Sequence, residues 1–198
     1  MKDRRLRSLK LLEEVGLNVP LYAVITKDDP DKARYFKKQC AVRFDLLKCP
    51  LPPLPGEVIV VRGWPPLIAH SSPCVAAKLS EVLDCDFVAH VTDVTSKDSV
   101  GAGVTLKTAE GKVIVEAVVK GTVRDVTRKG LVHVRGEMVG EKLVAKGPFP
   151  ELLGYCMFES AREALRLPPG ALEWSCHEGK YGVKGDHVVF WELITLKG

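Results

Sequence analysis

Apolar residues recur with two different periods along the chain, and the period separates the expected helices from the expected strands. Near the start, four apolar side chains follow one another at three-residue steps, which predicts an amphipathic helix. These four residues are Leu6, Leu9, Leu12 and Val15. Gly16 can adopt the left-handed conformation that ends a helix, and Pro20 favours an extended start for the strand that follows.

The next part of the chain mixes short helices and strands around a proline-rich connector. Asp29 and Pro30 are typical of a helix start, with Asp as the N-cap and Pro in the first turn. The connector, residues 49–56, holds four prolines and favours neither a helix nor a central strand. The other elements expected here are strands at 39–44, 57–62 and 87–92 and a helix at 72–82.

The second half of the chain has the pattern of a β-meander followed by one long helix and a hairpin. The expected strands are 103–108, 112–119, 121–126 and 131–135, and the last hairpin pairs 171–176 with 188–196. Pro150 opens the helix, whose predicted inward residues are Leu152, Leu153, Cys156, Met157, Ala161, Ala164 and Leu165. We therefore expect an α+β fold with antiparallel sheets and packed helices. The connector suggests an N-terminal lobe at 1–55 and a larger lobe at 56–198 that together form one unit.

Composition narrows the class of protein without fixing its function. The 198 residues are 46% hydrophobic and carry a net charge of +4, which is typical of a globular protein and compatible with phosphate-bearing ligands. No stretch approaches the roughly 20 apolar residues of a membrane span, so we expect no membrane partner. The charged N-terminus lacks the apolar core of a signal peptide, and the predicted location is the cytoplasm.

The six cysteines favour buried thiols over a metal site. They include no Cys-x-x-Cys pair, and a zinc site needs clustered ligands. The sequence is also compatible with a disulfide bond if the protein comes from a hyperthermophile, because intracellular proteins of such organisms can contain disulfides. The cysteines are Cys40, Cys49, Cys74, Cys85, Cys156 and Cys176.

Several short segments resemble, in order, the ATP-grasp domain of the phosphoenolpyruvate synthase and pyruvate phosphate dikinase type. The opening helix with Gly16-Leu17-Asn18-Val19-Pro20 and its strand is similar to the start of that domain. Ala41-Val42-Arg43 resembles its Val-Arg-Ser-Ser strand. The later matches are 99–106 with Ser-Gly-Val-Ala-Phe-Thr, 112–117 with an Ile-Glu-Ala strand, 171–174 with Asp-Ile-Glu-Trp and 188–192 with the strand that ends Leu-Gln-Ala-Arg-Pro.

The resemblance implies a two-lobed ATP-grasp-like architecture that binds ATP and Mg²⁺. Arg5, at the position of a phosphate-binding lysine, and Arg43 would contact phosphates, and Glu116 would join them as a nucleotide-binding residue. Glu173 and Glu192 would be the Mg²⁺ ligands. Two acidic side chains on neighbouring antiparallel strands can point at one spot, and Mg²⁺ takes a few carboxylates plus phosphate oxygens. Arginine neutralises phosphates by bidentate contacts.

The sequence also departs from the family pattern, and the departures bear on catalysis. Ile194 stands where the family has an arginine, Phe44-Asp45 replaces its Ser-Ser, and no glycine-rich phosphate loop is present. Losing a transition-state arginine removes a large electrostatic contribution to catalysis. Whether the protein is an enzyme is therefore left open.

The sequence is compatible with three functional hypotheses. The first is an ATP–Mg²⁺-binding protein, a phosphotransferase or ligase if active, with a second substrate that the sequence does not specify. The second is a non-catalytic module of the same fold that binds a protein partner. The third is a nucleic-acid-binding protein that uses basic residues, although few aromatic residues are available to stack on bases. These basic residues are Arg4, Arg5, Arg7, Lys10, Lys37 and Lys38 on one face and Arg124, Arg128, Lys129 and Arg135 on another.

Overall fold

A computed structural model describes residues 4–25, 42–48, 86–91 and 99–195. The chain forms two compact units, one made of residues 1–7 and 21–92 and the other of residues 8–20 and 93–198. The helix expected at Asp29, the proline-rich connector, the strand at 57–62 and the helix at 72–82 lie outside the described residues. The predicted lobe boundary at residue 55 falls there too and stays a prediction.

The first unit contains a three-stranded antiparallel sheet. Its strands are β1 (Tyr22–Ile25), β2 (Val42–Lys48) and β3 (Asp86–Val91), in the spatial order β1-β3-β2. Strands were expected at all three places, and β2 starts and ends a few residues later than the pattern predicted. The central strand β3 places His90 opposite both Tyr22 of β1 and Arg43 of β2.

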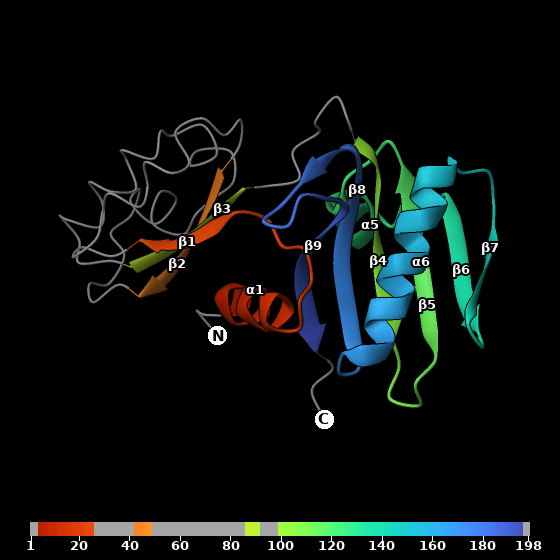
Figure 1. Ribbon diagram of the computed structural model, residues 1–198, viewed down its shortest axis with the longest axis horizontal. Coiled ribbons are helices and arrows are strands. Elements are labelled where there is room, and N and C mark those ends of the chain that lie inside the picture. Colours follow the sequence, from red (N-terminus) through yellow and green to blue (C-terminus); the bar gives the residue numbers. More distant parts are fainter. Residues whose placement is uncertain (1–3, 26–41, 49–85, 92–98, 196–198) are drawn as a thin grey trace. The chain divides into compact units, whose positions relative to one another are not determined.

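The second unit is built on a six-stranded antiparallel sheet in the order β7-β6-β5-β4-β8-β9 (Figure 1). The strands are β4 (Ser99–Lys107), β5 (Val113–Val119), β6 (Val134–Val139), β7 (Lys142–Lys146), β8 (Gly170–Tyr181) and β9 (Asp186–Thr195). The α+β class with antiparallel sheets and packed helices is thus confirmed. The hairpin β8–β9 is longer than expected, and β7 was not predicted.

Helix α6 (Glu151–Arg166) covers one face of this sheet (Figure 1). Five of its seven predicted inward residues are buried, whereas Leu152 is half-buried and Leu165 is 44% exposed. The contact is partly polar. Ser160 and Thr105 share a hydrogen bond of 2.7 Å, and the Trp174 indole N–H donates to Thr105 at 3.0 Å. Trp174 is fully buried, and its only polar atom is therefore satisfied inside the core.

The opposite face carries a short helix, α5 (Val123–Lys129), where the sequence pattern predicted a strand at 121–126. That prediction was wrong because local capping outweighs the β-propensity of the valines. The Asp125 carboxylate accepts hydrogen bonds from the Thr122 backbone N–H at 2.8 Å and hydroxyl at 2.9 Å. Gly130 ends the helix at φ +63°. Val123 and Val126, three residues apart, then bury one helical face.

The capping contacts of Asp125 predict a pH dependence for α5. Lys129, 2.7 Å from the carboxylate, and the Thr122 donors lower the pKa of Asp125 to about 2. Because this is below the unfolded value of about 3.9, the stabilisation is complete above about pH 5 and is lost as the pH falls toward 2. We expect the protection factors of the α5 amides, which are corrected for the intrinsic pH dependence of exchange, to fall over that range, and Asp125→Ala to lose about 1 kcal/mol at neutral pH and abolish the acid step.

Helix α1 (Arg4–Glu14) and the corner after it run beside β9 in the second unit from residue 8 onward. The helix ends as predicted, with Gly16 at φ +87° and the Leu17 N–H donating to the Leu12 carbonyl. The corner then follows the edge of the sheet: the Phe190 N–H donates to the Asn18 carbonyl at 2.8 Å. No helix in the described parts of the chain is long and apolar enough to cross a membrane.

Candidate functional site

Three of the five predicted site residues lie in one row across the six-stranded sheet. Glu173 of β8 is directly opposite Glu192 of β9, and it is also opposite Val104 of β4. Val104 in turn is opposite Glu116 of β5. Residues directly opposite each other in antiparallel strands project to the same face. The register therefore puts the three carboxylates on one face, the face that carries α5.

The three carboxylates differ in burial. Glu192 is 2% exposed, Glu173 is half-buried, and the Glu116 side chain is 39% exposed. Glu116 lies 3.7 Å from the Arg135 guanidinium of β6, which the register places directly opposite it. Glu173 and Glu192 also take part in polar interactions of their own. The row thus runs from a buried carboxylate on β9 to a solvent-facing ion pair on β5 and β6.

A β-bulge at Trp191 decides which face Glu192 occupies. Glu173 pairs with Glu192, but the next residue of β8, Trp174, pairs with Phe190, so Trp191 is an extra residue in β9. Strict alternation would put Glu192 on the same face as Phe190, under α6. The extra residue moves it to the other face, as bulges commonly do beside functional sites.

A buried hydrogen-bonded chain holds this bulge in place. The Trp191 indole N–H donates to the Ser175 hydroxyl at 2.7 Å, and Ser175 shares a second hydrogen bond of 2.7 Å with Nε2 of His177. All three side chains are buried. Satisfied polar networks of this kind fix a unique arrangement of the strands around them, here the strands that carry the carboxylates.

The carboxylate row lies between two apolar rows on the same face. On one side, Ala102 and Val118 belong to the core under α5. On the other side, the register aligns Ile114, Leu106, Ala171 and Ile194, of which Leu106 is 37% exposed and the others are half-buried. The carboxylates are thus bordered by an accessible apolar row on β5, β4, β8 and β9, which continues on β6 with the charged residue Glu137.

The predicted arginines belong to the first unit. Arg5 is a half-buried residue of α1, and Arg43 lies on β2 opposite His90. Their meeting with the glutamates stays a prediction. Arg135, one of the basic residues of the nucleic-acid hypothesis, is directly opposite Glu116, and this register places its guanidinium beside the carboxylate row. Of the basic residues in that hypothesis, Lys129 and Arg135 each pair with a carboxylate.

The carboxylates of this row have the chemistry of a site for Mg²⁺. Among the described residues, no group of three or more His, Cys, Asp and Glu side chains could hold a metal by itself. Mg²⁺ is usually bound by one or two carboxylates together with substrate phosphates and water. The cross-strand pair Glu173 and Glu192 fits that requirement.

Two of the six cysteines lie in the described residues, and both are buried free thiols. Cys176 of β8 donates to the Leu152 carbonyl of α6 at 3.4 Å. A hydrogen bond with Cys176, together with burial, raises the pKa of Cys156 well above its usual range. We expect neither thiol to react with iodoacetamide at pH 8 in the folded protein and both to react in guanidinium, as peptide mapping by mass spectrometry would show. Labelling of either residue in the folded state would contradict this packing.

Comparison with known proteins finds likeness only among solved structures. No family model and no curated protein matches the chain. D-alanine-D-alanine ligase from Coxiella burnetii matches 100% of this chain with 48% of its own, at 9% identity and a TM-score of 0.49. N5-carboxyaminoimidazole synthetase from Staphylococcus aureus, complexed with ADP, is 11% identical and has a TM-score of 0.49; the match covers 99% of this chain and 44% of the synthetase. The ATP-grasp ligase PsnB, complexed with a minimal precursor, is 13% identical and has a TM-score of 0.43; the match covers 96% of this chain and 51% of the ligase. The chain spans about half the length of these solved chains.

Proposed function

We propose that this protein is an ATP-grasp-like nucleotide-binding protein that holds ATP and Mg²⁺ on the carboxylate-bearing face of its six-stranded sheet. Glu173 and Glu192 would be the Mg²⁺ ligands, and Glu116 would contact the nucleotide. The observation that carries this proposal is the register that sets Glu173 opposite Glu192 on one face.

The physical argument rests on charge. Like charges directly opposite each other on neighbouring strands destabilise a sheet, and Glu192 is also buried. A divalent cation bound between the two carboxylates would attract both of them, so its binding would stabilise the pairing of β8 with β9. Mg²⁺ would in turn neutralise the phosphates of the nucleotide and orient them for transfer.

The remaining roles come from the sequence resemblance. Arg5 and Arg43 would bind the phosphates from the first unit, as in the phosphoenolpyruvate synthase type of ATP-grasp domain. Arg135 adds a side chain that is 66% exposed beside Glu116 and supplies positive charge within the row. We assign it a supporting part in phosphate binding, since guanidinium groups bind phosphate oxygens in a bidentate manner.

Ile194 limits what we propose about catalysis. It follows Glu192 by two residues, is half-buried, and stands where the family has an arginine. Binding of ATP–Mg²⁺ is therefore the proposed function, with phosphoryl transfer or ligation to a second substrate as its active form. A non-catalytic module of the same fold is the alternative.

Calorimetric titration of the purified protein with ATP tests the proposal. With Mg²⁺ present we expect a micromolar dissociation constant, and with EDTA an affinity at least about tenfold lower, which corresponds to about 1.4 kcal/mol. At 100 times the dissociation constant, ATP–Mg²⁺ should stabilise the fold by about 2.7 kcal/mol. No heat and no thermal shift at millimolar ATP would refute a nucleotide role.

A further inference from the structure

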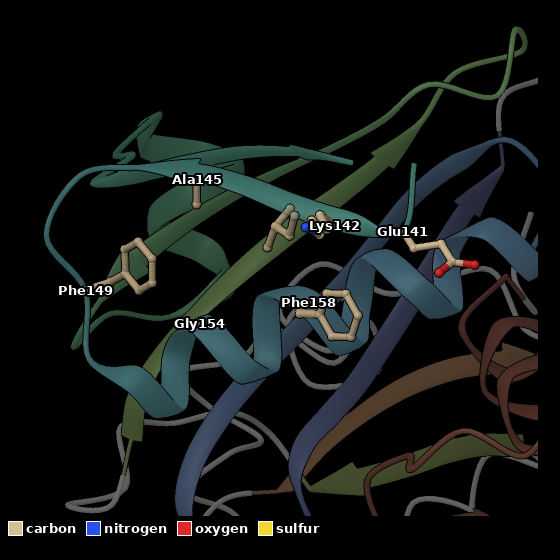
Figure 2. Close-up of a pocket in the computed structure, with 7 residues that line it drawn as sticks. Glu141, Lys142, Ala145, Phe149, Gly154 and Phe158 are labelled. Carbon is tan, nitrogen blue, oxygen red and sulfur yellow. The ribbon is translucent and has the colours of Figure 1, made fainter. Parts of the chain in front are cut away.

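The edge of the six-stranded sheet at β7 borders a groove that the proposed nucleotide site does not use. The groove has a volume of about 630 Å³ and lies between β7 and the first half of α6 (Figure 2). Its floor and walls are mainly apolar, and two charged residues border it at the β6–β7 turn. The lining residues are Leu143, Ala145, Phe149, Gly154 and Phe158, with Glu141 and Lys142 at the turn.

The two faces of β7 differ sharply in chemistry. Leu143 and Ala145 line the groove on the α6 side. Val144 and Lys146 alternate with them, as does Lys142, which also borders the end of the groove where β7 begins. All three are exposed, Val144 to 54%. In the described part of the chain β7 pairs with β6 alone, so the backbone amides and carbonyls along its other side are available for a further strand.

Phe149 and Gly154 shape the groove wall. A β-carbon at Gly154 would come within 2.8 Å of the Phe149 ring, so the missing side chain lets this ring lie directly against α6. Phe149 is nevertheless 36% exposed, and Phe158, one turn further along the helix, is half-buried. These two rings can bury more apolar surface against an incoming side chain.

We propose that β7 and this groove bind an extended segment of a partner polypeptide in which acidic and apolar residues alternate. The segment adds a strand to the sheet, which supplies backbone hydrogen bonds. Its apolar side chains enter the groove against Phe149 and Phe158. Its acidic side chains lie on the opposite face, beside Lys142 and Lys146.

Charge argues for an acidic partner over a second copy of this chain. Two β7 strands paired antiparallel about Val144 would set Lys142 opposite Lys146 of the other copy, twice. Like charges directly opposite each other are destabilising, and edge lysines are a known device against such self-pairing. Glutamate or aspartate at the same positions turns the repulsion into attraction. The acidic segment therefore matches both the lysines on one face of β7 and the apolar groove on the other, whereas a second copy of β7 does not.

Two capped, fluorescein-labelled peptides serve as probes in anisotropy titrations with the full chain. One has the sequence Glu-Leu-Glu-Val-Glu-Leu-Glu, and the other has lysine at each glutamate. We expect saturable binding of the acidic peptide only. In the variant Lys142→Glu/Lys146→Glu, the affinity for the acidic peptide should fall at least about tenfold, and the basic peptide should now bind. In Phe158→Ala, the affinity for the acidic peptide should also fall, but the preference for acidic over basic peptide should not change.

A matched control reverses two charges elsewhere on the same unit. Arg124→Glu/Arg128→Glu changes the net charge equally but lies on α5, and it should leave binding of the acidic peptide unchanged. Equal loss in both double variants would mean attraction to overall charge and would overturn the proposal. So would absence of acidic-peptide binding, binding of a single-stranded oligonucleotide in its place, or a dimer that assembles through β7 in sedimentation experiments.

Discussion

Glu192→Gln should weaken binding of ATP in the presence of Mg²⁺ by about tenfold or more, and Glu173→Gln should do the same. Glutamine keeps the shape of the side chain but removes the charge, and Mg²⁺ strongly favours carboxylate ligands. A tenfold loss corresponds to about 1.4 kcal/mol for each ligand. Calorimetry with and without EDTA measures the effect. The variants should bind ATP in EDTA about as well as the wild type, because the lost contact is to the metal.

Glu137→Gln provides the matched control. Glu137 lies on β6 and is opposite Ile114, one row away from the glutamates, and it pairs with Lys112 at the surface. Its substitution should leave the affinity for ATP–Mg²⁺ unchanged.

Thermal unfolding without ligand gives a second readout of the glutamate pair. Glu173→Gln keeps the shape of the side chain and removes one of two facing charges, but Glu173 also has a polar interaction of its own, so we expect a loss of no more than about 1 kcal/mol, which is about 2–4 °C in melting temperature. A clear fall in melting temperature with unchanged ATP affinity would instead make the two glutamates part of the structural network of the sheet, and the metal proposal would fail.

The sequence predicted most of the second unit because its strands and α6 follow simple periods. It was wrong at 121–126, where three β-branched residues suggested a strand. Neighbouring residues in the sequence do indicate a helix here, because Thr122 and Asp125 have capping-box spacing and Gly130 is a helix terminator. Two hydrogen bonds to one carboxylate outweighed the propensity of the valines.

The candidate site shows a different limit of sequence reasoning. Glu116, Glu173 and Glu192 could be picked out by residue type and resemblance, but their common face depends on the extra residue at Trp191. A shift of one residue sends a strand's side chains to the other face, and no period in the sequence marks such a bulge. Its support comes from Ser175 and His177 on the neighbouring strand, which only the folded sheet brings to Trp191.

The corner at Asn18 leads to the second large expected effect: Asn18→Ala should destabilise the protein by about 2–4 kcal/mol. The Asn18 amide donates to the carbonyls of Tyr181 and Val188, each at 2.8 Å, and accepts from the Lys184 N–H at 2.9 Å. Asn18 is 4% exposed, and alanine would leave three backbone groups in this region without their hydrogen bonds. Each unsatisfied buried group costs about 1–3 kcal/mol, with incomplete additivity. Urea unfolding measures the loss.

Two further variants separate the amide from the backbone of the corner. Asn18→Asp keeps an acceptor for Lys184 but sets a carboxylate against two carbonyl oxygens, so it should destabilise at least as much as alanine. Glu14→Ala, an exposed change on the preceding helix, should stay within about 0.5 kcal/mol of the wild type. Because the Asn18 side chain ties the chain's opening corner to the hairpin that carries Glu173 and Glu192, its loss should also accelerate amide exchange along β9. If β9 exchange and stability are both unchanged, the Asn18 side chain does not hold the hairpin in place.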